Sequence, residues 1–343
     1  MSEQKIGAAV FGAGWVAAEH IAAYQRNPHC EVVAVGSRRA ESAQARAAAA
    51  GASEAAIYTS FEELLRDERV DAISICTPNH LHCEETVEAA EAGKHVIVEK
   101  PIAVNLDELR QVRDAVRAAG VRSVVSFVLR WNPSFLNTKA LLAAGAIGEV
   151  LYAECDYWHE ISDWYAGWEW IRRKDSGASS FLAAGCHAVD AIRWFVGDIV
   201  AVSAFAGEVR HGFEYPPTVV GTVRFANGAV GKLSSSFDIV APYTFNVDLL
   251  GTRGTIRDNR LWSEVLLPGQ NGWATAPCLL PDSGAVEHHP FQDEIGHFLE
   301  CIRTGTESHV NIEDAVKTHE VCIAFDRSAA NGGEVVRLPL LPA

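Results

Sequence analysis

Two short motifs in the first hundred residues carry the chemistry that this sequence suggests most clearly. Glu99–Lys100–Pro101 follows the apolar run 96–98, which places a lysine at the carboxyl end of a predicted buried strand. Gly12–Ala13–Gly14 follows a second apolar run, 6–11, and offers a turn that can cradle a dinucleotide. Ligands of open α/β sheets bind at the carboxyl ends of the strands, so the two motifs are expected to converge. Together they predict a nicotinamide-dependent active site that includes Glu99 and Lys100.

The glycine motif has the residue types that a dinucleotide fingerprint requires. Gly12 permits the tight turn after the strand, Gly14 lets the backbone approach a pyrophosphate, and Ala17 is small enough for close packing of helix on strand. The helix that starts at Trp15, with Val16 next in its first turn, directs its amino terminus at the phosphates. The strand–turn–helix context gives this short pattern its weight, because the same spacing also occurs in ordinary turns.

The end of the second predicted strand, 31–36, bears on the choice between NAD and NADP. NAD enzymes usually place an acid there to bind the ribose 2′-hydroxyl, whereas this chain has Ser37, Arg38 and Arg39. Serine and arginine can bind a 2′-phosphate that a carboxylate would repel. The sequence therefore favours NADP over NAD, although the two arginines could also simply solvate the start of a helix.

A polar turn follows the predicted strand 72–76. Pro78 cannot continue a central strand, so the chain turns there, over the expected nicotinamide ribose. The Asn79 amide can donate to and accept from ribose hydroxyls, and Thr77 and His82 are further candidate cofactor contacts. The pair His80 and His82 has no matching acid or thiol nearby, so no metal site is predicted.

The first 126 residues alternate strand and helix signals, which predicts a parallel sheet covered by helices on both faces. Strands are expected at 6–11, 31–36, 72–76, 95–98 and 123–126, and helices at 15–26, 40–50, 84–92 and 106–119.

After residue 127 the segments become strand-rich and alternating, with Ala226–Asn227–Gly228 as a hairpin signal. This pattern predicts an α+β domain built on a largely antiparallel sheet. The predicted domains are therefore 1–126, which binds the cofactor, and 127–343, which binds substrate and forms oligomer contacts. In the second domain strands are expected at 150–158, 201–209, 219–225, 229–237 and 245–250, and helices at 183–195, 292–303 and 313–330.

Composition narrows the class of protein. The chain has 343 residues, more than one core usually takes, and 48% of them are hydrophobic. A formal charge of −15 disfavours nucleic-acid binding, which needs clustered Lys and Arg. No secretory leader and no apolar run of membrane-spanning length is evident. The eight cysteines include no Cys-x-x-Cys pair, so we expect reduced, mostly buried thiols in a cytoplasmic protein without structural zinc.

The segment 156–174 is unusually aromatic. Rings of this density predict either core and interface packing or a wall on which a sugar stacks. Acids and bases lie between the rings, as in sites for neutral sugars. The six rings are Tyr157, Trp158, Trp164, Tyr165, Trp168 and Trp170, of which Trp158 is a candidate substrate contact.

With four further motifs, these features resemble the Gfo/Idh/MocA family of sugar and inositol oxidoreductases over nearly the whole chain. The further motifs are Gly185–Cys186–His187–Ala188–Val189–Asp190, Phe291–Gln292–Asp293–Glu294, Asn311–Ile312–Glu313–Asp314–Ala315 and Ser328–Ala329–Ala330. The resemblance implies a Rossmann domain with a doubly wound parallel sheet. It also implies a second domain whose open sheet carries substrate on one face and often a subunit contact on the other.

The resemblance also assigns roles to individual residues. Lys100 is implied to act at the substrate, and His187 matches the histidine of an Asp–His pair. The aspartate of that pair would lie four residues earlier, where this chain has Ala183. Lys174 fits the Trp-x-x-x-Lys-x-x-Gly pattern and is a substrate candidate. Arg130, just after the last predicted strand of the first domain, is another.

Oxidation of a secondary alcohol needs a base for the hydroxyl proton and a group that polarises the forming carbonyl. Imidazole titrates near neutral pH, so His187 suits the first role, and Lys100 suits the second. We therefore expect an NAD(P)-dependent sugar or cyclitol dehydrogenase or ketoreductase. The alternatives are an NAD-dependent glycosidase that oxidises, eliminates and re-reduces, and a non-catalytic dinucleotide sensor. Apolar residues in the strands 219–225 and 229–237 predict a homo-oligomer, a dimer or tetramer.

Overall fold

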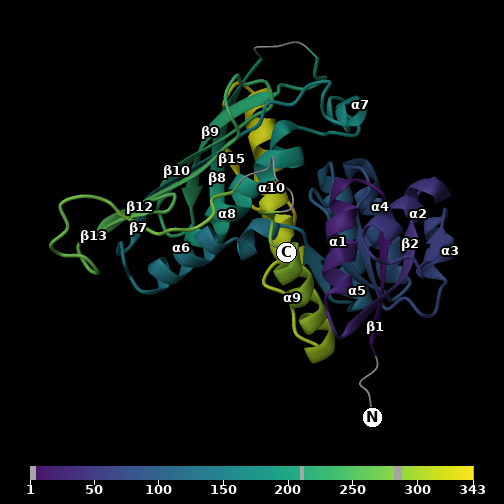
Figure 1. Cartoon of the computed structure of the whole chain (residues 1–343). Coiled ribbons are helices and arrows are strands. Elements are labelled where there is room, and N and C mark those ends of the chain that lie inside the picture. The colour runs from purple at the N-terminus through teal and green to yellow at the C-terminus, as the bar shows by residue number, and fades with distance from the viewer. Residues whose placement is uncertain (1–4, 209–211, 282–287, 343) are drawn as a thin grey trace. The chain divides into compact units, whose positions relative to one another are not determined.

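The computed structural model describes residues 5–208, 212–281 and 288–342, and the chain forms two compact units (Figure 1). The described residues among 1–128 and 286–316 make the first unit. Those among 129–285 and 317–343 make the second unit. Each unit has its own sheet.

The first unit is a six-stranded parallel sheet in the order β3-β2-β1-β4-β5-β6. The apolar runs of the sequence become its central strands because helices lie on both faces, which leaves Val10, Ile73 and Ile97 fully buried. The doubly wound fold predicted for this part is confirmed. Its strands are β1 Ile6–Phe11, β2 Cys30–Gly36, β3 Ala56–Tyr58, β4 Ala72–Ile75, β5 His95–Val98 and β6 Ser123–Val125.

The helices of this unit lie close to their predicted positions where the sequence marks their ends. The helix α5 begins after Asn105, whose side chain accepts from the Glu108 amide, and ends at the left-handed Gly120. The short elements β3 and α3 were not predicted. The helices are α1 Trp15–Gln25, α2 Ala40–Ala49, α3 Phe61–Leu65, α4 His82–Glu91 and α5 Leu106–Ala119, with a 3-10 turn at Asn79–Leu81.

The helix α9, Phe291–Thr304, also belongs to the first unit. Its apolar side buries Phe291, Ile295 and Phe298, and the Phe291 ring contacts that of His20 on α1. The sequence predicts this helix, but its pattern assigns residues 127–343 to one domain. The helix α10, Ile312–Ala330, begins in the first unit and continues into the second.

The second unit is built on a nine-stranded sheet in the order β14-β13-β12-β11-β7-β10-β9-β8-β15. Among the described strands of this second sheet only β7 and β10 pair in parallel, so the largely antiparallel sheet is confirmed. The predicted hairpin joins β9 to β10, with Gly228 at a positive φ of 91°. The strands are β7 Val150–Trp158, β8 Ile199–Gly207, β9 Thr218–Phe225, β10 Val230–Ser236, β11 Thr244–Gly251, β12 Gly254–Arg257, β13 Arg260–Ser263, β14 Ala274–Thr275 and β15 Val336–Arg337.

One face of this sheet packs against a helix whose start differs from the prediction. The expected helix 183–195 begins as a π-helix, Phe181–Gly185, and continues as α8, Cys186–Val196. Position 185 requires glycine, because a Cβ there would lie 2.7 Å from the Ser235 Cβ on β10. The unpredicted elements are α6 Pro133–Ala143, α7 Trp168–Ile171, the 3-10 turn Val128–Trp131 and the strands β12 to β15; residue 209, the predicted end of a strand, lies outside the described residues.

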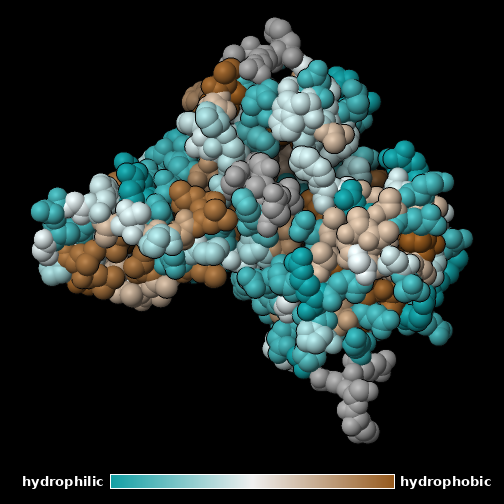
Figure 2. All heavy atoms as spheres, in the orientation of Figure 1, coloured by the Kyte–Doolittle hydropathy of each residue, from teal (hydrophilic) through white to brown (hydrophobic). Residues whose placement is uncertain are grey.

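The other face of the nine-stranded sheet is only partly covered. Val220, Val230 and Trp262 point to this face and are 38–47% exposed. Figure 2 shows apolar side chains gathered at the end of the sheet that carries β12 and β13. At the centre of the face lies a polar group, in which Lys232 Nζ is 2.6 Å from Glu154 and 2.8 Å from Asp156.

All eight cysteines are free thiols. No helix among the described residues has both the length and the apolar character needed to cross a membrane.

Candidate active site

The glycine turn after β1 has the geometry that the fingerprint predicts. Gly12 has a φ of 121°, and a Cβ there would lie 2.2 Å from the carbonyl oxygen of Cys76. Only glycine fits this position. Gly14 caps α1, and a Cβ built on it would meet nothing within 4 Å. The turn is therefore tight on its inner side and open on its outer side.

The first turn of α1 is prepared for an anion. No side chain caps its amino terminus and no acid lies in its first turn, so the positive end of the helix dipole is not neutralised there. Ala17 is fully buried against the sheet, as predicted, whereas Trp15 is exposed and Val16 half-buried. From α2, the Arg46 guanidinium donates to the Ala13 carbonyl, with Nη2 3.1 Å from the oxygen.

The loop after β2 presents cations and no acid. Arg38 and Arg39 are exposed, and Arg39 lies at the amino end of α2 without a side-chain cap bond. Ser37 is held by its backbone, since its amide donates to the Tyr58 carbonyl over 3.1 Å. The side chains at this position can thus meet a phosphate without opposition from a neighbouring carboxylate of the loop.

The turn after β4 is held by two buried side chains of α4. The Thr77 hydroxyl donates to Glu85, and burial raises the pKa of the Glu85 carboxyl from 4.5 to about 7. His82 is almost fully buried, with Nε2 2.7 Å from the Thr77 carbonyl and Nδ1 2.7 Å from the Pro101 carbonyl. Burial lowers the pKa of the His82 imidazole. Asn79 is buried at the start of the 3-10 turn.

His82 therefore connects the loops after β4 and β5, because its two nitrogens face one carbonyl from each. The sequence predicts a direct cofactor contact for His82. The geometry gives it the role of fixing the Thr77 turn relative to Pro101, the residue after Lys100.

A buried polar network lies behind Glu99. His20 Nδ1 is 3.0 Å from the Ser74 hydroxyl and His20 Nε2 is 3.3 Å from Glu99 Oε1. The Tyr24 hydroxyl is 2.9 Å from that of Ser74. Burial alone would raise the pKa of Glu99, but the hydrogen bond from His20 and the charge of Lys100 hold it below its ordinary value. Glu99 is thus kept as a carboxylate next to Lys100.

A second carboxyl group lies close to this network. Glu294 on α9 is fully buried, and its Oε2 accepts from the Ser126 hydroxyl at 3.0 Å. Burial and the neighbouring Glu99 raise the pKa of Glu294 well above its ordinary value. Its Oε1 has no hydrogen-bond partner among the described residues, which fits a neutral carboxylic acid.

The second unit presents His187 in a cluster of rings. His187 lies in the first turn of α8, half-buried, with the Tyr157 ring stacked on it at a centroid distance of 6.3 Å. The Tyr157 hydroxyl is 3.4 Å from His159 Nδ1. Tyr243, from the loop before β11, packs edge-on against the rings of both Tyr157 and His159. The result is an aromatic surface beside the imidazole, to which Tyr243 adds a ring that the sequence did not single out.

Trp158 is not part of this surface. Side chains alternate along a strand, so Trp158 points to the opposite face of β7 from Tyr157. Its indole donates to the Ser234 hydroxyl over 2.8 Å on that face. The position of Trp158 therefore argues against the substrate role predicted for it and favours Tyr157.

Lys174 is exposed, and its backbone amide donates to Glu214.

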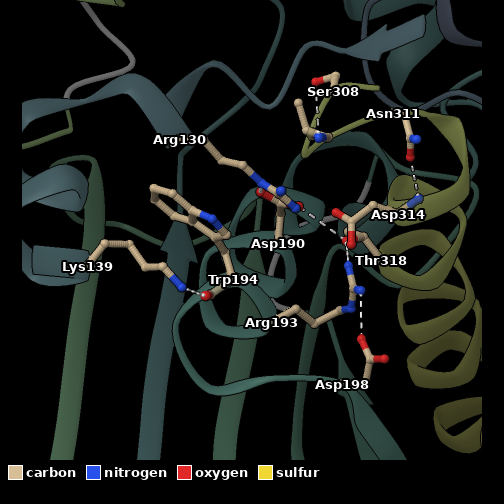
Figure 3. Close-up of polar contacts among 11 residues, drawn as sticks. Arg130, Lys139, Asp190, Arg193, Trp194, Asp198, Ser308, Asn311, Asp314 and Thr318 are labelled. Atoms are coloured by element: carbon tan, nitrogen blue, oxygen red, sulfur yellow. Dashed lines mark hydrogen bonds and ion pairs between the residues drawn. The ribbon is translucent and has the colours of Figure 1, made fainter. Parts of the chain in front are cut away.

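Arg130 is buried in an ion network rather than presented to a ligand (Figure 3). Its guanidinium binds both carboxylate oxygens of Asp190, at 2.8 and 2.6 Å. Asp190 also accepts from Thr318 on α10 at 3.3 Å, and Arg193 donates to the same hydroxyl at 2.7 Å. Because the guanidinium already binds Asp190 through two nitrogens, it does not present the pair of donors that the predicted substrate role of Arg130 would need. Asp190, one turn after His187, thus anchors α8 to two other segments.

Ala183, where the family pattern has an aspartate, lies in the π-helix and is buried. The sequence also did not single out His20 or Arg46, and it marked Glu294 only as the last residue of a family motif, with no role in a site. His20 and Glu294 each fall on the buried side of a helix, and a polar residue at such a position indicates a candidate functional residue.

Comparison with known proteins places these features in a family. The model described as "Oxidoreductase family, NAD-binding Rossmann fold" (GFO_IDH_MocA) matches residues 6–127, and the model described as "GFO/IDH/MocA C-terminal domain" matches residues 135–257. The chain is 28% identical to scyllo-inositol 2-dehydrogenase (NAD(+)) of Bacillus subtilis (strain 168), over 79% of this chain and 78% of that protein. It is 29% identical to D-xylose 1-dehydrogenase (NADP(+)) 2 of Haloferax volcanii, over 92% and 94% of the two chains.

Among solved structures, a levoglucosan dehydrogenase in complex with NADH and levoglucosan has the same fold. It superposes with a TM-score of 0.88 at 24% identity, covering 98% of this chain and all of the other.

Proposed function

Because the chain belongs to the GFO/IDH/MocA family of oxidoreductases, we propose that it transfers a hydride between NADP or NAD and a ring carbon of a sugar or cyclitol. One observation carries this proposal. The glycine turn after β1 and Lys100 after β5 follow the carboxyl ends of strands in one parallel sheet, where ligands of such folds bind. The names of the relatives, an inositol dehydrogenase that uses NAD and a xylose dehydrogenase that uses NADP, support the same chemistry.

The residues around the turn fit a dinucleotide. The closed inner side of Gly12 and the uncapped start of α1 suit a pyrophosphate. In the proposal Ser37 and Arg38 hold the adenine-side ribose, and Thr77 and Asn79 border the nicotinamide ribose. The bound nicotinamide supplies the carbon that accepts or gives up the hydride.

We assign Lys100 to the oxygen of the reacting carbon. A cation at that position stabilises the charge that develops on the oxygen as alcohol and ketone interconvert. Glu99, held as a carboxylate by His20, balances this charge and restrains the backbone on which Lys100 lies. His187 is assigned as the base that takes the hydroxyl proton, with Tyr157 stacked beside it as a surface for the sugar ring.

NADP is the proposed preferred form of the cofactor. The support is the loop after β2, which presents Arg38 and Arg39 and contains no acid. A guanidinium can form charge-assisted hydrogen bonds to a 2′-phosphate, whereas NAD offers it only a hydroxyl.

Steady-state kinetics with sugars and cyclitols, followed at the absorbance of the reduced nicotinamide, test the proposal. Lys100→Ala should lower turnover on the best substrate by on the order of a hundredfold or more. His187→Ala should slow it less, if Lys100 shares the proton transfer. Cofactor affinity should largely survive in both variants. The exposed Lys5, changed to Met, is the matched control for loss of a lysine and should leave turnover unchanged.

Three outcomes would contradict the proposal. Near wild-type turnover in Lys100→Ala would mean that the reacting oxygen lies elsewhere. Product formation without net cofactor reduction would favour a glycosidase that oxidises, eliminates and re-reduces. Tight dinucleotide binding without turnover on any sugar would favour a sensor.

A further inference from the structure

We propose that Arg46 is a positioning residue for the dinucleotide pyrophosphate, because it fixes the orientation of the Ala13–Gly14 peptide. The inference rests on the proposed function, since it needs the dinucleotide to bind at the glycine turn. It adds a residue from α2 to a site otherwise made of the β1–α1 turn and the strand ends.

The inference depends on one hydrogen bond, which the Arg46 side chain near the end of α2 donates to the Ala13 carbonyl just before α1. Arg46 lies in the last turn of α2, where Ala43 and Ala47 on the same side are buried against the rest of the first unit. This packing fixes α2 against the first unit and so fixes the point from which the Arg46 side chain extends and its direction. Its Nη2 reaches the Ala13 carbonyl at 3.1 Å, in a half-buried position.

The consequence follows from the planarity of the peptide. In a trans peptide the C=O and the N–H point in opposite directions. A carbonyl held toward α2 therefore directs the Gly14 amide away from α2. Within the described chain the Gly14 amide donates to no other group, and the space beside Gly14 is open. An amide presented in this way can donate to a phosphate oxygen.

The turn needs such a restraint because of its own composition. Gly14 caps α1 without a side chain, and glycine has more backbone freedom than any other residue. A serine or aspartate at the cap would fix the turn by bonding to the helix amides, but it would also occupy the anion site. Arg46 can hold the peptide from outside and leave the amides of α1 open.

Charge adds to geometry. A guanidinium has five N–H donors, and one contact to Ala13 leaves others available. Within the described residues no carboxylate pairs with Arg46, so its positive charge is not neutralised locally. Arg38 and Arg39 lie at the other end of α2. Of these two, Arg38 is assigned to the ribose end of the cofactor, whereas Arg46 acts on the part that NAD and NADP share.

The test is calorimetric titration of NADH and NADPH into the whole chain. Arg46→Met should raise the dissociation constants of both by the same factor, on the order of ten- to a hundredfold. Arg46→Lys keeps a charged donor of similar reach and should stay within about threefold of wild type. Arg66→Met is the matched control: the Arg66 side chain, at the residue after α3, is 70% exposed and pairs only with Glu62 among the described residues. It should bind both cofactors as wild type does.

The outcomes separate the possibilities. Unchanged affinity in Arg46→Met, or a loss confined to NADPH, would overturn the inference; the latter would make Arg46 a reader of the 2′-phosphate. Equal losses in Arg46→Lys and Arg46→Met would also overturn it, because a donor to Ala13 would then not matter. If Arg46→Met does not fold, Arg46→Gln, which keeps the helix but not the reach, takes its place. A wild-type chain that bound neither dinucleotide would instead overturn the proposed function.

Discussion

Replacing Glu85 with glutamine should make the protein's stability depend less on pH. Glu85 is 8% exposed, accepts from the Thr77 hydroxyl, and has a pKa raised by burial from 4.5 to about 7. Glu84 and Glu88 on the same helix add to this rise. The folded state thus keeps a proton that the unfolded chain releases between these two pH values. Stability must therefore fall as pH rises from about 4.5 to 7.

The size of the effect follows from that difference in pKa. Full ionisation of the unfolded-state carboxyl favours unfolding by about 3 kcal/mol above pH 7, and by less than about 1 kcal/mol at pH 5. Glutamine has no proton to lose and can still accept from Thr77. The free energy of unfolding of Glu85→Gln, minus that of wild type, should therefore rise by about 2.5 kcal/mol between pH 5 and pH 8.

Urea unfolding of both proteins at unit steps of pH measures this difference. Other groups titrate in both chains and cancel, so only the change in the difference with pH matters. Glu91→Gln, at the exposed end of the same helix and not among the charges that raise the pKa of Glu85, is the control and should give a nearly constant difference. A constant difference for Glu85→Gln as well, or one that falls with pH, would refute the assignment of a protonated Glu85.

Three further predictions concern other parts of the molecule. Arg130→Met should destabilise the protein by about 3–5 kcal/mol, because it leaves the Asp190 carboxylate buried without its bidentate partner; thermal or urea unfolding measures this, and a loss below about 1 kcal/mol would contradict it. Arg38→Ala should weaken NADPH by on the order of tenfold or more and leave NADH nearly unchanged; equal affinity of the wild type for both cofactors would contradict the NADP preference. Light scattering at micromolar concentration should show a homo-oligomer held through the exposed sheet face of Val220 and Trp262, and a monomer mass of 37.1 kDa would refute it.

The elements that the sequence placed well are those whose ends or faces are fixed locally. The strand β5 is short and ends in three fully buried apolar residues, Val96–Val98, so its limits coincide with the prediction. Asn105 and Gly120 mark both ends of α5 in the same way. The strand β3 has only three residues, all half-buried, and α3 has five. Neither is long enough to show a period of its own, so tertiary pairing decides them.

The residues of the candidate site differ in the same way in whether the sequence could predict them. The glycine turn and the Glu-Lys-Pro motif could be found because each depends on residues that are adjacent in sequence. The partners of Arg130 and Glu99 could not be found, because Asp190 lies 60 positions and His20 79 positions away. Trp158 shows a second limit. An aromatic segment indicates a ring-lined surface, but only the register of β7 decides which ring points to His187.

The position of α9 has a consequence for how the chain folds as it is made. The first unit takes this helix from beyond residue 290, so a nascent chain that ends after β6 lacks the cover for His20 and the acceptor for Ser126. At 5–20 residues per second, a ribosome needs on the order of 10–40 s to reach the end of the missing part. During that interval the apolar side of α1 that receives Phe291 has no partner of its own. A chaperone that binds exposed apolar helices would have its best opportunity there, and a fragment cut after residue 126 would keep that exposure permanently.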